Sequence, residues 1–164
     1  MLYRGKKLNG AWTTGQLLTV HVTTGTDKTF LADKNATAYD IYNNLTAVLY
    51  EVQPDTLGKA TGRTDMTGKE IFEGDILELH YHSYSEFAVV RFGEYEPENE
   101  YEPDTHIGFY VEKDGEFEDS AKVQQELPAV LEFCKVVGNI HDSVVIRDKE
   151  IVQKQGMPDG TLPF

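Results

Sequence analysis

Cysteine, tryptophan and basic residues are all scarce in this 164-residue sequence. It has one cysteine, one tryptophan, and 15 Lys and Arg residues against 28 Asp and Glu residues. One cysteine excludes an intrachain disulfide, which fits a protein of a reducing cytoplasm. The net charge of −13 disfavours nonspecific binding to nucleic-acid phosphates and to anionic membranes. A basic protein partner remains compatible with this charge.

Long apolar runs and common catalytic motifs are also missing from the sequence. No stretch approaches the ~20 apolar residues needed to span a bilayer. Arg4, Lys6 and Lys7 near the start are not followed by an apolar run, so no secretory signal is expected. The serines lack a Gly-x-Ser-x-Gly context, and no glycine-rich phosphate loop is found. We therefore expect no enzymatic activity and no cofactor.

Alternation of apolar and polar residues, with a period of two, is the clearest pattern present. It occurs at 17–23, 75–82, 87–92 and 107–112, and predicts a mainly β fold with little helix. Asn9-Gly10 predicts a hairpin turn near the N-terminus, because both residue types tolerate positive φ. The residues expected to be buried are Leu77, Leu79, Tyr81, Val90, Phe109, Leu131 and Cys134.

Less regular stretches separate these strands. Residues 37–44 are ambiguous between a helix and a loop, and the stretch 45–52, rich in Leu, Val and Tyr, indicates a buried strand. Residues 119–127 favour a short helix that ends before Pro128, and 129–140 indicate the last strands. The residues from 153 onward are polar and rich in Gly and Pro, which is typical of a loosely held tail.

An acidic residue occupies every second position between 94 and 104. The alternating carboxylates are Glu94, Glu96, Glu98, Glu100, Glu102 and Asp104, with Tyr95 and Tyr101 between them. Pro97 and Pro103 exclude a central strand, so the segment is expected to be an exposed loop or hairpin tip. It is a candidate surface for a basic protein partner, or an imitation of a DNA phosphate track. Alternating charge of this kind also keeps an exposed β edge soluble and unpaired.

A weak metal-site candidate lies on the predicted strand 75–82. Glu78, His80 and His82 project from one face of that strand, and carboxylate and imidazole groups are zinc ligands. Alternate residues of a strand lie ~6.6–7 Å apart along its axis, which is wide for one ion. The same pattern is typical of a solvent-facing polar strand face, so no metal is expected.

Three blocks of residues, in this order and spacing, resemble the YopX family of phage and prophage proteins. The blocks are Leu2–Lys6 with Asn9–Trp12 and Gly15; Val52–Gly58 with Thr61-Gly62 and Thr67–Ile76; and Val136–His141. Together they span residues 2–141. The chain differs from many relatives at Thr67-Gly68, where Asn-Gly is common, and after Ile140-His141, where a proline often follows.

The resemblance implies a fold and a source, but no activity. It implies a small SH3-like barrel or roll, encoded by a phage or prophage of a bacterium. We accordingly expect an N-terminal β segment at 1–58, the barrel or roll at 59–145 with the acidic insertion 94–104, and a C-terminal tail at 146–164. The family supplies no functional residues to carry over.

Two classes of function remain open from the sequence. The first is a noncatalytic protein-interaction module in the bacterial cytoplasm, which binds a basic host or phage protein. The second is a small-molecule- or metal-dependent enzyme with an unrecognised site, and an acidic DNA mimic that inhibits a host protein is a further reading. Self-association is also expected, because small β proteins have edges to cover and Trp12 and the tyrosines offer anchors.

Overall fold

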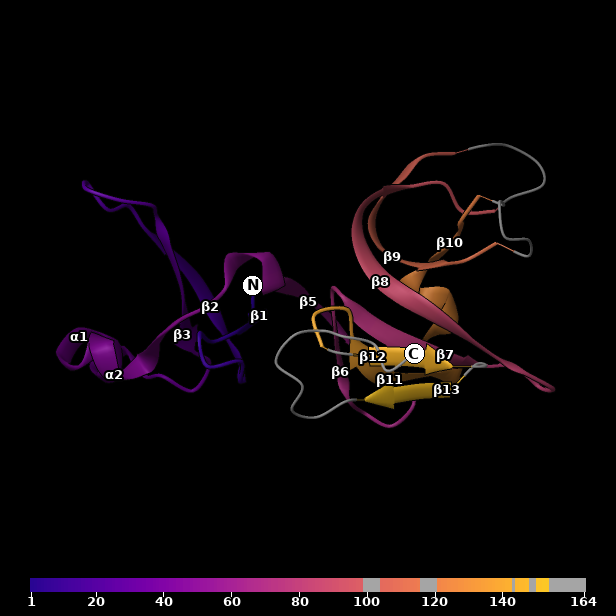
Figure 1. Ribbon diagram of the computed structural model, residues 1–164, viewed down its shortest axis with the longest axis horizontal. Helices are drawn as coiled ribbons and strands as arrows, with labels where there is room; N and C mark the ends of the chain where they lie inside the picture. Colours follow the sequence, from indigo (N-terminus) through magenta and orange to yellow (C-terminus); the bar gives the residue numbers. More distant parts are fainter. Residues whose placement is uncertain (99–103, 116–120, 143, 148–149, 154–164) are drawn as a thin grey trace. The chain divides into compact units, whose positions relative to one another are not determined.

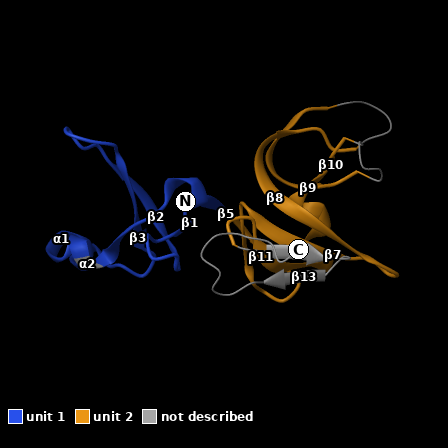
Figure 2. Ribbon diagram, in the orientation of Figure 1, with its two compact units in different colours: residues 1–60 blue, residues 61–164 orange. Residues whose placement is uncertain are grey.

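The computed structural model describes residues 1–98, 104–115, 121–142, 144–147 and 150–153. The chain divides into two compact units, unit 1 (Met1–Ala60) and unit 2 (Thr61–Phe164), shown in Figure 2. Strands make up most of the regular structure in Figure 1, which confirms the predicted mainly β fold. None of the helices that the structure describes is long and apolar enough to cross a membrane.

Unit 1 is built on an antiparallel sheet in which the strands lie in the order β4-β3-β2-β1-β5. Their bounds are β1 Tyr3–Lys6, β2 Trp12–Val20, β3 Lys28–Asp33, β4 Leu49–Glu51 and β5 Gly58–Thr64. Strands β1 and β2 form the predicted hairpin, in which Lys6 pairs with Trp12 across the turn. Gly10 has a φ of 85° in that turn, a value that glycine adopts at little cost.

Strand β2 changes its neighbours at Gly15. Residues 12–15 pair with β1, whereas the register with β3 runs from Gly15 opposite Asp33 to Val20 opposite Lys28. A Cβ atom at Gly15 would lie 1.7 Å from the backbone oxygen of Ala32. This close backbone approach requires glycine and brings β2 against β3.

The segment between β3 and β5 differs in part from the prediction. Helix α1 (Ala38–Asn43) resolves the ambiguity at 37–44, and a capping box formed by Thr37 and Asp40 fixes its first turn. The expected strand at 45–52 was wrong in its first half, which forms the single-turn helix α2 (Leu45–Val48). Within this stretch, only the three residues of β4 form a strand, and the 3₁₀ turn η1 (Pro54–Thr56) follows.

Unit 2 contains a five-stranded antiparallel sheet in the order β10-β9-β8-β7-β11. The bounds are β7 Asp75–His80, β8 Ser85–Tyr95, β9 His106–Lys113, β10 Val123–Glu126 and β11 Cys134–Asn139. The short strand β6 (Glu70–Phe72) is hydrogen-bonded to β5, which begins in unit 1 and ends in unit 2. Figure 1 shows that β8 and β9 curve strongly. The order of the described strands ends at β10 and β11, so this is a curved open sheet and not a closed barrel.

The core of unit 2 lies on the sheet face that carries Leu77, Leu79 and Val90, all fully buried as predicted. Cys134 is also fully buried, as expected. The other predicted core residues are only partly buried and pack around this cluster; they are Tyr81, Phe109 and Leu131. The 3₁₀ helix η2 (Leu127–Phe133) contacts β7 and β9 and contributes Leu127 and Val130 to the core.

The predicted helix at 119–127 was wrong for the residues that the structure describes, 121–127. Residues 123–126 form strand β10, and the helical turns of η2 begin after it. Pro128 stands in the first turn of η2, where a missing backbone N–H costs nothing, so proline marks a helix start here. Strands β12 (Val144–Arg147) and β13 (Glu150–Gln153) pair as a hairpin that we did not predict.

Candidate functional site

The acidic stretch begins on the ordered end of the β8–β9 ribbon. Glu94 belongs to β8 and pairs with Ile107, so the expected loop starts only after Tyr95. Glu96 and Glu98 follow that strand, Asp104 precedes β9, and the side chains of all four acids are exposed. We call these four residues the acidic tip. Glu100, Tyr101 and Glu102 lie outside the described residues.

Tyr95 is not the surface contact that the sequence suggested. Its side chain is 7% exposed, and its ring stacks on Tyr110 with centroids 4.9 Å apart and contacts His106 at 5.5 Å. Gly93 and Gly108 pair between these positions and place no side chain between the rings. Burial raises the pKa of Tyr95, and the nearby Glu126 carboxylate raises it further. The neutral, packed ring therefore fixes the strand end from which the acidic tip extends.

Three polar contacts hold the base of the acidic tip. The backbone N–H of Glu96 donates to the side-chain oxygen of Gln124, 3.0 Å away on β10. The ring nitrogens of His106 lie 3.5 Å from an Asp104 oxygen and 3.4 Å from a Glu126 oxygen. Both ends of the acidic segment are thus tied to the sheet, and the His106 ring lies between two carboxylates.

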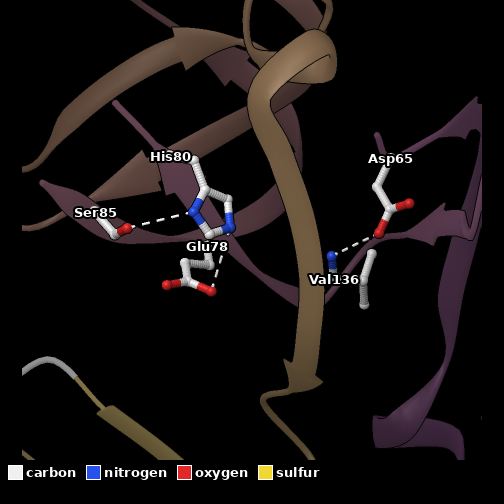
Figure 3. A network of polar contacts seen from close by, with 5 residues as sticks. All are labelled: Asp65, Glu78, His80, Ser85 and Val136. Atoms are coloured by element: carbon white, nitrogen blue, oxygen red, sulfur yellow. Dashed lines mark hydrogen bonds and ion pairs between the residues drawn. The ribbon is translucent and has the colours of Figure 1, made fainter. Parts of the chain in front are cut away.

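The structure brings together only two of the three residues of the weak metal-site candidate. His80 Nε2 lies 3.4 Å from a Glu78 carboxylate oxygen, and His80 Nδ1 lies 3.5 Å from the Ser85 hydroxyl (Figure 3). His82 is not on this strand face, because β7 ends at His80 and the chain turns toward β8. No group of three or more metal-ligating side chains is found in the described part of the chain.

Asp65 is a buried carboxylate that sequence reasoning missed. One oxygen accepts hydrogen bonds from the Thr67 N–H, the Thr67 hydroxyl and the Lys69 N–H, at 2.7–3.0 Å. The other oxygen accepts from the Val136 N–H at 2.8 Å, so it ties this turn to β11 (Figure 3). Burial raises the pKa of Asp65, but these hydrogen bonds outweigh it and the pKa lies below its usual value. A saturated, ionised carboxylate of this kind stabilises the fold.

Asp75, at the next turn of the chain, makes a second link to β11. Its carboxylate accepts hydrogen bonds from the Phe72 N–H at 2.8 Å and from the Asn139 side-chain amide at 3.1 Å. Gly74 has a φ of 87°, and its N–H and carbonyl bond to Val90 and Ile140. The residue blocks around 67–76 and 136–141 therefore meet in space, and their contacts are structural.

Comparison with known families places the chain in a family. The family model described as YopX protein matches residues 2–145. The chain belongs to the YopX family. The match covers both blocks that meet at Asp75 and Asn139, and it includes the N-terminal hairpin. No curated protein matches this YopX-family chain at a significant level.

Cys134 of this YopX-family chain is predicted to be inert in the folded protein. Burial raises the pKa of its thiol to about 11, and the Asp65 carboxylate adds to the effect. Since the thiolate is the nucleophile, a thiol reagent at pH 8 should label Cys134 only after denaturation. Mass spectrometry of native and denatured samples measures this directly. Fast labelling of the native protein would contradict the burial.

Proposed function

We propose that this YopX-family chain is a noncatalytic protein-interaction module, encoded by a phage or prophage and working in the cytoplasm of its bacterial host. The acidic tip attracts a basic surface of a partner protein. The observation that carries the proposal is the placement of Glu94, Glu96, Glu98 and Asp104, all exposed, at the end of an ordered ribbon. Exposed carboxylates close together in the chain create a negative field, which speeds the approach of a basic partner.

The net charge of unit 2 also supports the attraction of a basic partner. Residues 61–164 carry nine Lys and Arg residues against 23 Asp and Glu residues, a net charge of −14. Residues 1–60 carry six basic and five acidic residues, a net charge of +1. A basic partner is therefore drawn to unit 2. Nucleic acid is repelled from it, so the expected partner is a protein.

The environment of the reactive side chains supports a noncatalytic role. Cys134 is buried with a raised pKa, and Asp65 already accepts four hydrogen bonds. Within the described residues, Glu78 and His80 form a pair at the surface without a third ligand. None of these groups combines access to a substrate with the partner that general acid–base or nucleophilic chemistry needs.

The test is a matched pair of charge variants used as bait in a bacterial host lysate. The tip variant is Glu94→Gln/Glu96→Gln/Glu98→Gln, and the control is Asp55→Asn/Asp114→Asn/Glu132→Gln, drawn from exposed acids elsewhere. Both remove three negative charges. We expect the tip variant to capture about tenfold less of the specific partner, because electrostatic steering depends on local field. The control should capture nearly as much as the unmodified chain.

Folding must be unaffected for this comparison to be valid. The substituted side chains are exposed, so each variant should change the free energy of unfolding by less than about 0.5 kcal/mol per site. Circular dichroism and thermal melting check this. If both variants lose capture equally, the loss follows from the change in net charge and not from the acidic tip. If both variants keep capture equally, the binding surface lies elsewhere than at the acidic tip. Either result rejects the proposal.

A further inference from the structure

The core face of the β8–β9 ribbon becomes exposed toward the acidic tip. Val90 pairs with Val111, and both side chains are buried in the core of unit 2. Two residues further along, Phe92 pairs with Phe109 on the same face; their ring centroids lie 4.8 Å apart, and Phe92 is 38% exposed. Ile107 comes next on this face and is 74% exposed. We call Phe92, Phe109 and Ile107 the apolar strip.

The two faces of this ribbon end differ in how they use their apolar residues. On one face Tyr95 stacks on Tyr110 and is almost fully buried within the unit. On the other face Ile107 is the most exposed large hydrophobic residue that the structure describes in unit 2. A large aliphatic side chain gains free energy when a partner removes it from water. The apolar strip is therefore the part of this sheet that gains most from being covered.

We propose that the apolar strip, together with the acidic tip, is the docking site for a protein segment in which lysine or arginine stands next to large apolar side chains. This inference rests on the proposed function and defines the chemistry of the partner. The two features are adjacent, because Glu94 pairs directly with Ile107 across β8 and β9. Directly opposite residues have Cβ atoms ~4.5–5.5 Å apart. An apolar side chain packed on Ile107 therefore brings a neighbouring cationic group within reach of the Glu94 carboxylate.

Charge complementarity selects this occupant. The carboxylates beside the apolar strip repel the phosphates of nucleic acid and of anionic lipids. A second copy of the chain brings a net charge of −13 and is also disfavoured. A segment that is both basic and apolar matches both features, and each feature has its own effect on binding. The carboxylates raise the rate of association, whereas the buried apolar contact slows dissociation.

The test measures how the immobilised full chain binds a short peptide of lysine and leucine in an amphipathic helical pattern. Ile107→Ser should raise the dissociation rate constant about tenfold, because a large aliphatic contact is lost. The tip variant should mainly lower the association rate constant. Met66→Ser is the matched control, since Met66 is another exposed aliphatic residue of unit 2, and it should change neither constant. A comparison peptide with serine in place of leucine should bind more weakly and should not respond to Ile107→Ser.

A fluorescent label at the same position tests the location of the site. Cys134 is buried, so the thiol introduced by Ile107→Cys is the one that a reagent labels in the folded chain. An environment-sensitive fluorophore on this thiol should shift its emission to the blue when the lysine–leucine peptide binds. The same fluorophore on the thiol introduced by Met66→Cys should not respond.

The outcomes separate this inference from the proposed function. Unchanged kinetics for Ile107→Ser, equal weakening by Met66→Ser, or no response of the label at position 107 would each overturn the inference. If the tip variant still slows association in those cases, only the inference fails and the proposed function stands. If the tip variant binds the peptide as fast as the unmodified chain, the proposed steering by the acidic tip fails as well.

Discussion

Replacing Asp65 with alanine is expected to lower the free energy of unfolding by about 2–4 kcal/mol, because buried donors lose a charged acceptor. The Val136 N–H is buried and has its 2.8 Å bond to Asp65 as its partner, so it is left unsatisfied. The donors of Thr67 and Lys69 are only partly buried and regain water. Urea unfolding followed by circular dichroism measures the loss. Asp114→Ala is the control, since Asp114 is exposed and its removal should change stability by less than about 0.5 kcal/mol.

The stabilisation by Asp65 should also depend on pH in a defined direction. Its pKa is lowered in the folded state, so the carboxylate stabilises the fold fully above the unfolded pKa of about 3.9. This stability is lost as pH falls through the lower folded pKa. The difference in unfolding free energy between the unmodified chain and Asp65→Ala should be constant from pH 7 to about pH 5 and then shrink in acid. A difference that grows in acid would contradict the assigned hydrogen bonds.

Leu79→Ala is expected to cost about 2–5 kcal/mol, because it leaves a cavity in the core of unit 2. Leu79 has no exposed surface and pairs with Cys134 on one side and Glu86 on the other, in the centre of the sheet. The surrounding strands restrain collapse of the cavity. Chemical denaturation gives the value.

Ile107→Ala is the matched control for Leu79→Ala. Ile107 is also on the unit 2 sheet, but its side chain is 74% exposed, so truncation should cost less than about 1 kcal/mol. A cost below about half a kcal/mol for Leu79→Ala would place that side chain at the surface and contradict the described core.

Strands with one buried face were predictable from the sequence. Leu77 and Leu79 alternate with Glu78 and His80, and the sheet buries the first pair and leaves the second pair more exposed. A period of two carries this information directly. The same pattern predicted a strand at 17–23, and β2 does extend to Val20, but the side chains of its outer half are exposed on both faces. Alternation does not say whether another layer covers the strand.

Short apolar runs and isolated acids were harder to predict, for physical reasons. Three of the four residues at 45–48 are apolar, which suits either a helix or a strand, and periodicity over four residues does not separate these structures. Asp65 stands among many carboxylates, and its partner Val136 lies 71 residues away. Such a contact depends on the tertiary fold. Tyr95 was assigned to the surface because acids flank it, but the stacking on Tyr110 buries it.

The salt dependence of partner capture tests the central claim that the acidic tip steers a basic partner. The Debye length falls from about 10 Å at 0.1 M salt to about 3 Å at 1 M, so electrostatic attraction weakens over this range. We predict that capture by the unmodified chain falls steeply with salt, and that Glu94→Gln/Glu96→Gln/Glu98→Gln captures less at low salt with a shallower dependence. Identical salt curves for the two proteins would contradict the claim.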